Sequence, residues 1–492
     1  MSFNIKKYLT LNSILLLIVM LAAVFFRFYN TPNRYGFDID PTRDGLIVDY
    51  AAKTLQFPLI GPPSGIGPFT FGPWYYYQLI LFKIIFPFLN FAPWIYIGIL
   101  STIAVFVMYK IGVLLEGKKL GLILALFMAV TPAETGQIRA LSNPTLIPLY
   151  GVLAIWIFIK FVKEKPPLWM AFLWGLVLGI GINNHYQMLG LLPLPVIAFC
   201  YKKNKRWTGA LALIAGIFVA FLPLLAFNFI HGWSTVKGLI FYATQGTKGV
   251  YIPNRWLNYV GDFWPVFLAY VLGIPAKAGL YVGLVMGLVI GYLTLKREIS
   301  IPSIFLVITF LINFLVLRFF PGQREYYYLL YLHPLILILF GLIIIWLFDF
   351  KLGKYLGVLI ILIALYGMLV QSVARLGSAS DQLQFKNEAK VIASNYPSKK
   401  FVLYECKNSQ KNRVRGVVFF LNMHNLVGDN GIKIAYPAEG CRFPLDKNAE
   451  PKYLNNLKAV NISYAQDGLL LEYGWSMVTP KTVFTQLFQE TF

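Results

Sequence analysis

The residues best suited to chemistry lie in a short acidic segment that follows the first long apolar run. The segment reads FDIDPTRD over residues 37–44, so three carboxylates fall within seven residues. A carboxylate near hydrocarbon is costly, so a cluster in this place needs an explanation. Paired carboxylates can bind a divalent cation, and one of them can accept a proton from a hydroxyl nucleophile. Asp38 and Asp40 are therefore candidate catalytic residues, and the candidate ligands of any metal.

A structural role for the same segment is also open. Asp at an N-cap followed by Pro at the first helical position is a common helix start, and Asp40-Pro41 fits that pattern. The residues that follow are amphipathic, with Ile47 and Ala51 on one face. Asp40 could therefore cap a helix that lies at the membrane interface, whereas Asp38 has no such structural explanation.

The composition shows what kind of scaffold must position these side chains. Of the 492 residues, 58% are hydrophobic and 13% are charged, whereas a soluble globular chain has about a quarter charged residues. These values exclude a disordered chain, a disulfide-dense secreted module and a soluble enzyme. They predict an α-helical polytopic membrane protein.

Eleven apolar runs can each form a spanning helix, which needs about 20 residues including flanking positions. The segments 74–90 and 262–275 are apolar but interrupted or crowded, and we expect them to be helices that lie at the interface or dip into it. If both crossed, the count would be 13. The runs lie near 11–29, 92–114, 119–133, 143–163, 168–184, 186–201, 208–230, 276–295, 300–319, 327–348 and 355–372.

The formal net charge of +22 comes from short basic clusters between the apolar runs. Short loops rich in Lys and Arg stay on the cytoplasmic side of a membrane. With a cytoplasmic N-terminus, every cluster falls on that side, and segments 30–91, 231–262 and 373–492 fall on the other. We therefore expect a multi-pass protein of the cell membrane, with no nucleic-acid partner, since a soluble basic face is absent. The clusters are Lys6-Lys7, Lys118-Lys119, 163–165, 202–206, Lys296-Arg297 and 351–354.

The chain changes character near residue 376. Charged residues increase, and short strand-like runs appear at 401–404 and 432–436. We expect a transmembrane domain over 1–375, with its first outer loop at 30–91, and a small α/β extracytoplasmic domain over 376–492. Cys406 and Cys441 lie in this second part, and the sequence allows either a disulfide between them or two free thiols.

A second unusual stretch of the first outer loop reads GPPSGIGPFTFGPWYYY over residues 61–77. It is not a phosphate-binding P-loop, because it lacks the terminal Gly-Lys-Ser/Thr and a preceding strand. Its Gly and Pro residues prevent regular structure, and its aromatic residues suit the headgroup layer. The simplest interpretation is a rigid turn at the interface.

With these motifs in view, the chain resembles the GT-C membrane glycosyltransferases. It looks most like the branch containing protein O-mannosyltransferases and lipid A aminoarabinose transferases, of the glycosyltransferase family 39/83 type. The resemblance covers about residues 10–350. It is carried by DPTRD at 40–44, by the stretch 61–77, by RALSNP at 139–144 and by Asn184-His185-Tyr186.

The resemblance implies a bundle of spans around a cavity that opens to the outer face. The donor would be a polyprenyl-phosphate sugar, and a carboxylate of the first outer loop would be the general base. By motif position that base is Asp40, with Asp38 as the alternative. The resemblance leaves the need for a divalent cation open.

A polyprenyl-phosphate donor would bring a phosphate to the ends of the spans, where cationic groups could stabilise it. Each candidate also has a plain structural explanation, because arginines at span ends often reach toward headgroups and His185 could simply be an interfacial histidine. The candidate phosphate-binding residues are Arg43, Arg139, Arg324 and His185, with Arg318 a weaker one. The candidate pocket residues are Asp44, Asn143, Tyr186 and Tyr326.

The resemblance, together with the acidic segment, implies an inverting glycosyltransferase that moves a sugar to a hydroxyl of a protein, a lipid or a glycan at the outer surface, among membrane lipids. One alternative is a transporter or flippase of lipid-linked sugars, which would favour ionisable groups near mid-membrane and two related halves. Another is a non-enzymatic membrane assembly protein. The sequence favours neither, because the carboxylates cluster at one face.

Overall fold

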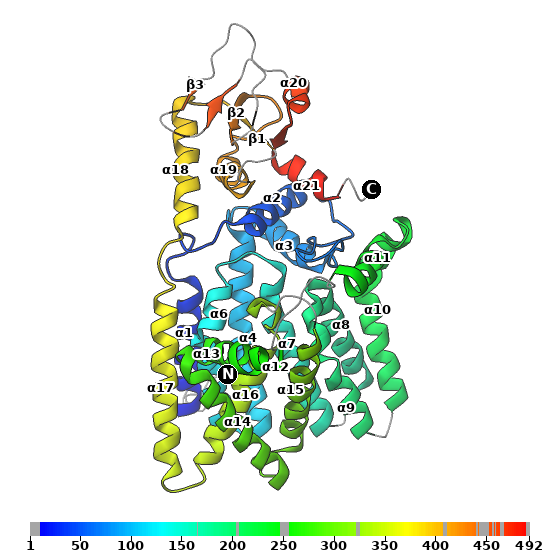
Figure 1. Ribbon diagram of the computed structural model, residues 1–492, viewed down its shortest axis with the longest axis vertical. Coiled ribbons are helices and arrows are strands. Elements are labelled where there is room, and N and C mark those ends of the chain that lie inside the picture. Colours follow the sequence, from blue (N-terminus) through cyan, green and yellow to red (C-terminus); the bar gives the residue numbers. More distant parts are fainter. Residues whose placement is uncertain are drawn as a thin grey trace, which may run out of the picture.

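The computed structural model describes residues 10–164, 166–202, 206–246, 255–320, 325–406, 411–438, 441, 452–454, 457, 459–462 and 467–488. A bundle of long helices carries a smaller mixed region at one end (Figure 1). Eight helices in this part of the chain are long and apolar enough to cross a membrane. The protein is therefore a polytopic membrane protein, as the composition predicts.

All eleven predicted spans are helical. The eight longer ones are α1 (Leu11–Phe28), α4 (Ala92–Glu116), α5 with α6 (Lys118–Val130 and Pro132–Gln137), η2 with α7 (Asn143–Leu146 and Ile147–Lys163), α10 (Arg206–Ile230), α14 (Ala276–Lys296), α15 (Ile301–Phe319) and α17 (Gly353–Val373). The three shorter ones are α8 (Leu168–Asn184), η3 with α9 (Tyr186–Leu191 and Pro193–Tyr201) and α16 (Leu332–Leu347).

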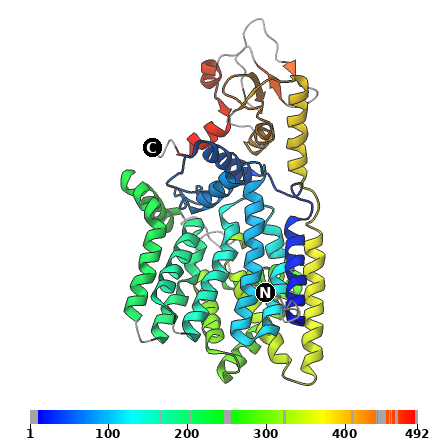
Figure 2. The ribbon, with the colours of Figure 1, turned by 180° about the vertical axis from the view of Figure 1, so that it is seen from behind.

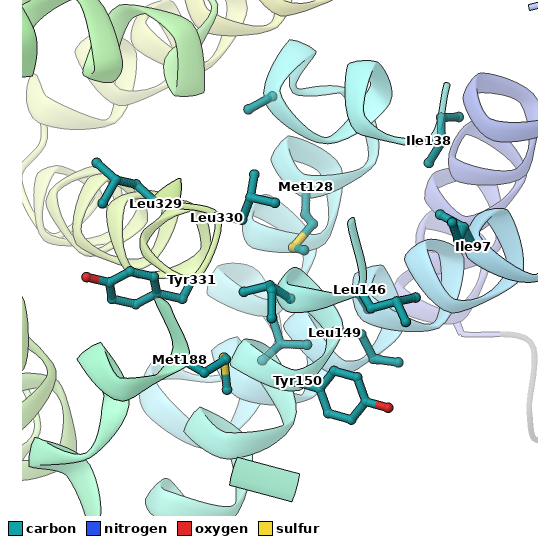
Figure 3. Close-up of a cluster of buried hydrophobic side chains, with 14 of the residues drawn as sticks. Ile97, Met128, Ile138, Leu146, Leu149, Tyr150, Met188, Leu329, Leu330 and Tyr331 are labelled. Carbon is teal, nitrogen blue, oxygen red and sulfur yellow. The ribbon is translucent and has the colours of Figure 1, made fainter. Parts of the chain in front are cut away.

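The centre of the bundle is built around α16, which is apolar on all sides and buried over most of its length. It packs against α5, α14 and α17. The core continues into the turn before α16, where Leu330 and Tyr331 belong to the same buried cluster as Met128, Leu146 and Met188 (Figure 3). This packing explains why a helix too short for a lipid-exposed span lies inside the bundle.

The basic turns between the helices lie at one end of the bundle. Lys202 Nζ donates to the Glu164 carbonyl at 3.3 Å, which joins the α7–α8 turn to the α9–α10 turn. The Ser300 amide donates to Glu116 Oε1 at 3.0 Å, which joins the α14–α15 turn to the end of α4. Lys163 Nζ donates to the Leu115 carbonyl at 3.5 Å, which joins the two pairs of turns. The predicted grouping on one side is therefore present for the described residues of the clusters at 118–119, 163–165, 202–206 and 296–297. We call the other end of the bundle the α2 end.

Short helices cover the α2 end. They include α2 (Ile39–Thr54) and α3 (Trp74–Ile85), which come from the predicted outer loop. The segment predicted at 262–275 forms α13 (Trp264–Leu272), which is buried and packs against α14 and α16 rather than lying on the surface of the bundle. The remaining elements are α11 (Ser234–Phe241), η4 (Tyr242–Gly246), α12 (Arg255–Leu257) and η5 (Asn258–Phe263).

The C-terminal region follows α17 and contains a five-stranded sheet in the order β3-β4-β2-β1-β5. Its central strands are parallel, with Phe401 opposite Ile432, and β5 runs antiparallel to β1. Cys406 and Cys441 are joined by a disulfide, so of the two open possibilities the structure has the bonded one. The elements of this region are α18 (Ser380–Asn395), β1 (Phe401–Cys406), α19 (Lys411–Met423), β2 (Ile432–Tyr436), β3 (Lys452–Tyr453), β4 (Val460–Asn461), α20 (Asp467–Glu472), β5 (Trp475–Val478) and α21 (Pro480–Phe488). In the bundle, the short 3-10 helix η6 (Tyr326–Tyr328) precedes α16.

The C-terminal region packs directly on α2. Helix α2 lies between α19 and α21 above and the bundle below, in both views of the ribbon (Figure 2). The Phe37 ring, just before α2, stacks between Trp94 at 5.3 Å and Phe420 at 5.2 Å. Buried residues of α19 and α21 belong to the same continuous hydrophobic cluster as the bundle. The acidic segment is therefore enclosed from two sides.

Candidate functional site

The acidic segment forms the start of α2. The helix begins at Ile39, so the N-cap is Asp38 and not Asp40, and the Asp38 carboxylate makes no capping hydrogen bond. The expectation that Asp40 caps the helix is therefore wrong, because the first turn starts two residues earlier than Pro41 predicts. Asp40 instead lies within the first turn, where the positive end of the helix dipole favours a negative charge.

A chain of polar contacts links Asp40 to the interior. Arg43 Nη1 lies 2.9 Å from Asp40 Oδ1, and Arg43 Nε lies 2.7 Å from Asp44 Oδ1. The Tyr76 hydroxyl of α3 donates to the same Asp44 oxygen at 2.8 Å. The Asp44 side chain is fully buried, and a buried carboxylate is tolerated only when it is paired and hydrogen-bonded. Tyr76 and Asp44 therefore hold Arg43, and Arg43 holds Asp40.

The pKa values of Asp44, Arg43 and Asp38 are shifted by different combinations of burial and charge. Burial raises the pKa of Asp44, and Arg43 opposes that effect. Burial lowers the pKa of Arg43, but Asp44, Tyr76 and Asp40 together raise it well above its ordinary value, so Arg43 stays charged. Burial, followed by the charge of Asp40, raises the pKa of Asp38. Asp38 is therefore a stronger base than an ordinary aspartate.

Accessibility separates the three carboxylates. The Asp40 side chain is 51% exposed and Asp38 is also exposed, whereas Asp44 is completely enclosed. Asp38 and Asp40 can therefore meet a substrate, and Asp44, predicted as a pocket residue, supports Arg43 from behind. Arg43, predicted as a phosphate-binding residue, directs two of its nitrogen atoms to the carboxylates.

The Gly- and Pro-rich stretch 61–77 folds back on itself and rests on the end of α8. Gly61 donates to the Phe71 carbonyl at 2.8 Å, and Gly72 donates to the Asn183 carbonyl at 2.9 Å. A Cβ atom on Gly72 would lie 1.6 Å from Asn183 Oδ1, so only glycine fits this contact. The turn therefore serves to bring the following helix, α3 with Tyr76, over the bundle.

Three predicted site residues meet at the same place. The Tyr186 hydroxyl donates to the Thr70 carbonyl at 3.2 Å, and Asn143 Nδ2 donates to the Asn184 carbonyl at 2.6 Å. His185 stacks between the rings of Phe71 at 4.8 Å and Tyr328 at 5.3 Å. The motifs at 61–77, 139–144 and 184–186 are therefore neighbours in space.

Arg139 contacts the residues that immediately precede the acidic segment. Its Nε donates to the Arg34 carbonyl at 3.2 Å, and its own carbonyl accepts from the Gly36 amide at 2.8 Å. Burial, followed by the charge of Arg139, lowers the pKa of Arg34 to about 10. Arg139 thus holds the segment that leads into Asp38, next to the buried Arg34.

The other candidates lie farther along the chain. The Tyr326 ring packs against Phe263 at 5.7 Å and Phe267 at 6.0 Å, beside α13. The Arg318 guanidinium lies 4.5 Å from the centre of the Trp256 ring. Arg324 lies outside the described residues.

Two residues of this region are not among the sequence predictions. Tyr76 is predicted only as an interfacial aromatic residue, although its place in the Tyr75-Tyr76-Tyr77 run after a rigid turn was the available signal. Arg415 of α19 has no predicted role. Burial lowers the pKa of Arg415, Glu405 raises it, and the charges of Arg43 and Asp44 also act on it. No sequence signal joins positions so far apart.

A divalent cation at Asp38 and Asp40 has limited support from their surroundings. Within the part of the chain that the structure describes, no group of three or more His, Cys, Asp or Glu side chains is placed to hold a metal ion. Arg43 contacts Asp40, and its positive charge opposes a cation there. Since such cations take about six oxygen ligands, most would have to come from the donor phosphate and water.

Comparison with known proteins identifies the fold. No family model matches the sequence, and no curated protein matches it significantly. The structure is similar to that of ArnT from Cupriavidus metallidurans bound to undecaprenyl phosphate, with a TM-score of 0.55 and 10% identity, over 93% of this chain and 98% of that one. The fold is GT-C-like.

A second solved structure agrees with the GT-C-like fold. The oligosaccharyltransferase of Archaeoglobus fulgidus, in complex with Zn and sulfate, matches with a TM-score of 0.50 and 16% identity over 78% of this chain. The present chain covers 56% of the length of that protein. Identities of this size relate the two chains by their fold alone.

Proposed function

We propose that the protein is a membrane glycosyltransferase that takes a sugar from a polyprenyl-phosphate donor and transfers it to a hydroxyl group. The observation that carries the proposal is the arrangement of α2: an accessible Asp40 is held by Arg43, which Asp44 and Tyr76 fix from the interior, at one end of a GT-C-like bundle. The solved ArnT structure holds undecaprenyl phosphate, which is the kind of lipid carrier that we propose for this chain.

In the proposed reaction, Asp40 removes the proton of the acceptor hydroxyl as that oxygen attacks the anomeric carbon. The bond from the anomeric carbon to the donor phosphate breaks, and polyprenyl phosphate leaves with the electron pair. Attack from the face opposite the phosphate inverts the anomeric centre. Asp38 is the alternative base, because burial raises its pKa above the ordinary value of an aspartate.

The leaving phosphate would need cationic groups close to α2. We propose Arg139 and Arg324 for this role, with His185 near the donor, and Asn143, Tyr186 and Tyr326 around the sugar. The support for His185, Asn143 and Tyr186 is that they surround the stretch 61–77, which leads into α3 and Tyr76. The support for Arg139 is its contact with the segment before Asp38.

We further propose that the α2 end faces the outside of the cell membrane and that the N-terminus is cytoplasmic. The support is that the described basic turns share the other end of the bundle, and basic turns stay on the cytoplasmic side. The acceptor would then be a hydroxyl of an extracytoplasmic protein, lipid or glycan.

The test incubates the purified protein with a panel of radiolabelled polyprenyl-phosphate sugars, with and without candidate acceptors. We expect label to leave the lipid for an acceptor or water, and Asp40→Asn to lower that rate by about a hundredfold or more. Asp349→Asn, at an exposed position between α16 and α17, removes the same charge and is the matched control.

Two results would contradict the proposal. If Asp40→Asn turns over like the wild type while Asp38→Asn does not, the base is Asp38. If the protein moves labelled lipid across vesicles and never releases the sugar from it, the protein is a transporter of lipid-linked sugars.

A further inference from the structure

A groove runs between the C-terminal region and the bundle, on the side of α18 that faces α19. Its volume is about 470 Å³. Pro32 and Phe91, at the ends of α1 and α4, form its base, and residues of α18 and α19 form its walls. The groove therefore starts at the surface of the bundle and follows α18 away from it.

The lower part of the groove is apolar. Phe91 and Phe420 pack edge to face at 6.4 Å and present ring surface to it. Hydrocarbon placed here would be removed from water on both sides. This part suits the glycerol and upper acyl portion of a membrane lipid, because it lies beside the ends of two spanning helices.

One face of α18 carries the polar groups. Gln382, Lys386 and Lys390 are spaced by four residues and line the groove on successive turns of the helix. Neither lysine forms an ion pair with any residue that the structure describes. The described lining contains no Asp or Glu, so the groove complements a negative charge.

Gln382 gives a second, independent indication of a ligand. Its side chain is 3% exposed, and no described residue donates a hydrogen bond to its Oε1 atom. A buried amide oxygen without a donor is unfavourable, so a ligand hydroxyl at this point would stabilise the complex. The nearby acids do not supply this donor, because an ionised carboxylate only accepts hydrogen bonds. Asp381 accepts from the Phe37 amide at 2.9 Å, and Glu388 pairs with Arg413 at 2.9 Å.

We propose that this groove binds an anionic phospholipid with a hydroxylated headgroup. Its phosphate lies at Lys386 and Lys390, a hydroxyl donates to Gln382 Oε1, and its apolar part packs on Phe91 and Phe420. The proposal rests on the groove alone and does not depend on glycosyl transfer. It implies that lipid occupancy stabilises the contact between the C-terminal region and the bundle.

The test measures thermal unfolding of the full-length protein in detergent during titration with short-chain phosphatidylglycerol. A ligand that binds the folded state raises the midpoint as its concentration rises. We expect Lys386→Gln/Lys390→Gln to weaken the apparent affinity by about tenfold or more, as for loss of two charge-assisted contacts. We expect Gln382→Leu to weaken it as well.

The matched control is Lys399→Gln/Lys481→Gln, which removes two exposed charges of the same region outside the groove and should bind like the wild type. If the control variant loses as much affinity for phosphatidylglycerol as Lys386→Gln/Lys390→Gln, the proposal of a binding site in this groove is wrong. Equal binding of short-chain phosphatidylcholine would overturn the assignment to an anionic, hydroxylated lipid. Equal binding of glycerol 3-phosphate would show a site for free phosphate and not for a lipid.

Discussion

At the scale of single residues, the buried partners of Arg43 matter as much as the exposed carboxylates. Asp40 alone on a helix surface could adopt many side-chain positions. The contact with Arg43 restricts it, and Arg43 is restricted in turn by Asp44. A base that is fixed before the substrate arrives needs less reorganisation during the reaction. We infer that the next contact in this series, from the Tyr76 hydroxyl to Asp44, also affects the rate of sugar transfer.

Tyr76→Phe tests this inference. It removes the hydroxyl that donates to Asp44 and leaves a buried carboxylate with one partner fewer, which costs about 1–3 kcal/mol of the free energy of unfolding. We expect a lower rate of sugar transfer together with a lower unfolding midpoint. Tyr77→Phe, one position along the same helix and only partly buried, is the control. A wild-type rate in Tyr76→Phe would remove Tyr76 from the positioning role.

At the scale of elements, the stretch 61–77 determines where α3 begins. Its contact with the end of α8 depends on the absence of a side chain at Gly72, because Asn183 occupies the space that a Cβ atom would need. The same stretch contacts Tyr186 and His185. One tight turn therefore places both the aromatic cluster at the end of α8 and the Tyr76 that supports α2.

Gly72→Ala should displace this turn. We expect a loss of about 1–3 kcal/mol of stability, as for overpacking of a well-packed site, and a fall in transfer rate because α3 moves away from α2. In the same turn, a Cβ atom on Gly65 would meet nothing within 4 Å, so Gly65→Ala should behave like the wild type. The unfolding midpoint and the transfer rate of the two variants are measured by thermal unfolding and by the labelled-donor assay. Equal values for Gly72→Ala and Gly65→Ala would contradict the role of Gly72.

At the scale of the whole molecule, the C-terminal region is joined to the bundle by more than the chain connection. Asn422 Nδ2 donates to Asp49 Oδ2 at 2.6 Å, and Phe484 packs against Tyr50 at 5.0 Å. Helix α2 thus has neighbours on both sides, and Arg415 brings a charge from the C-terminal region toward Asp44. The division into domains at residues 375 and 376 stays a prediction.

The orientation of the whole molecule can be measured by cysteine labelling. In a background with Cys200→Ser, we expect Lys399→Cys in the C-terminal region to react with a membrane-impermeant maleimide in intact cells. Lys119→Cys, at an exposed position in the first turn of α5 at the opposite end, should react only after permeabilisation. The reverse pattern would place the basic turns outside and would exclude extracytoplasmic transfer.

The sequence by itself determined the membrane architecture, because apolar runs, basic turns and the change of composition near residue 376 act locally. It also located the acidic segment, since three carboxylates after a span stand out whatever surrounds them. It placed the helix start wrongly, because a proline fits the third helical position as well as the first, where no backbone N–H is needed.

Only the tertiary structure decided which carboxylate is buried, which are accessible and what holds them. Asp44 looks like Asp40 in the sequence, but Tyr76 of α3 and the packing of α19 over α2 enclose it. The groove with Gln382, Lys386 and Lys390 likewise exists only where α18 meets the ends of α1 and α4. Such contacts join residues more than 300 positions apart, as between Phe37 and Asp381. Their formation depends on the packing of the complete fold, which local sequence patterns do not encode.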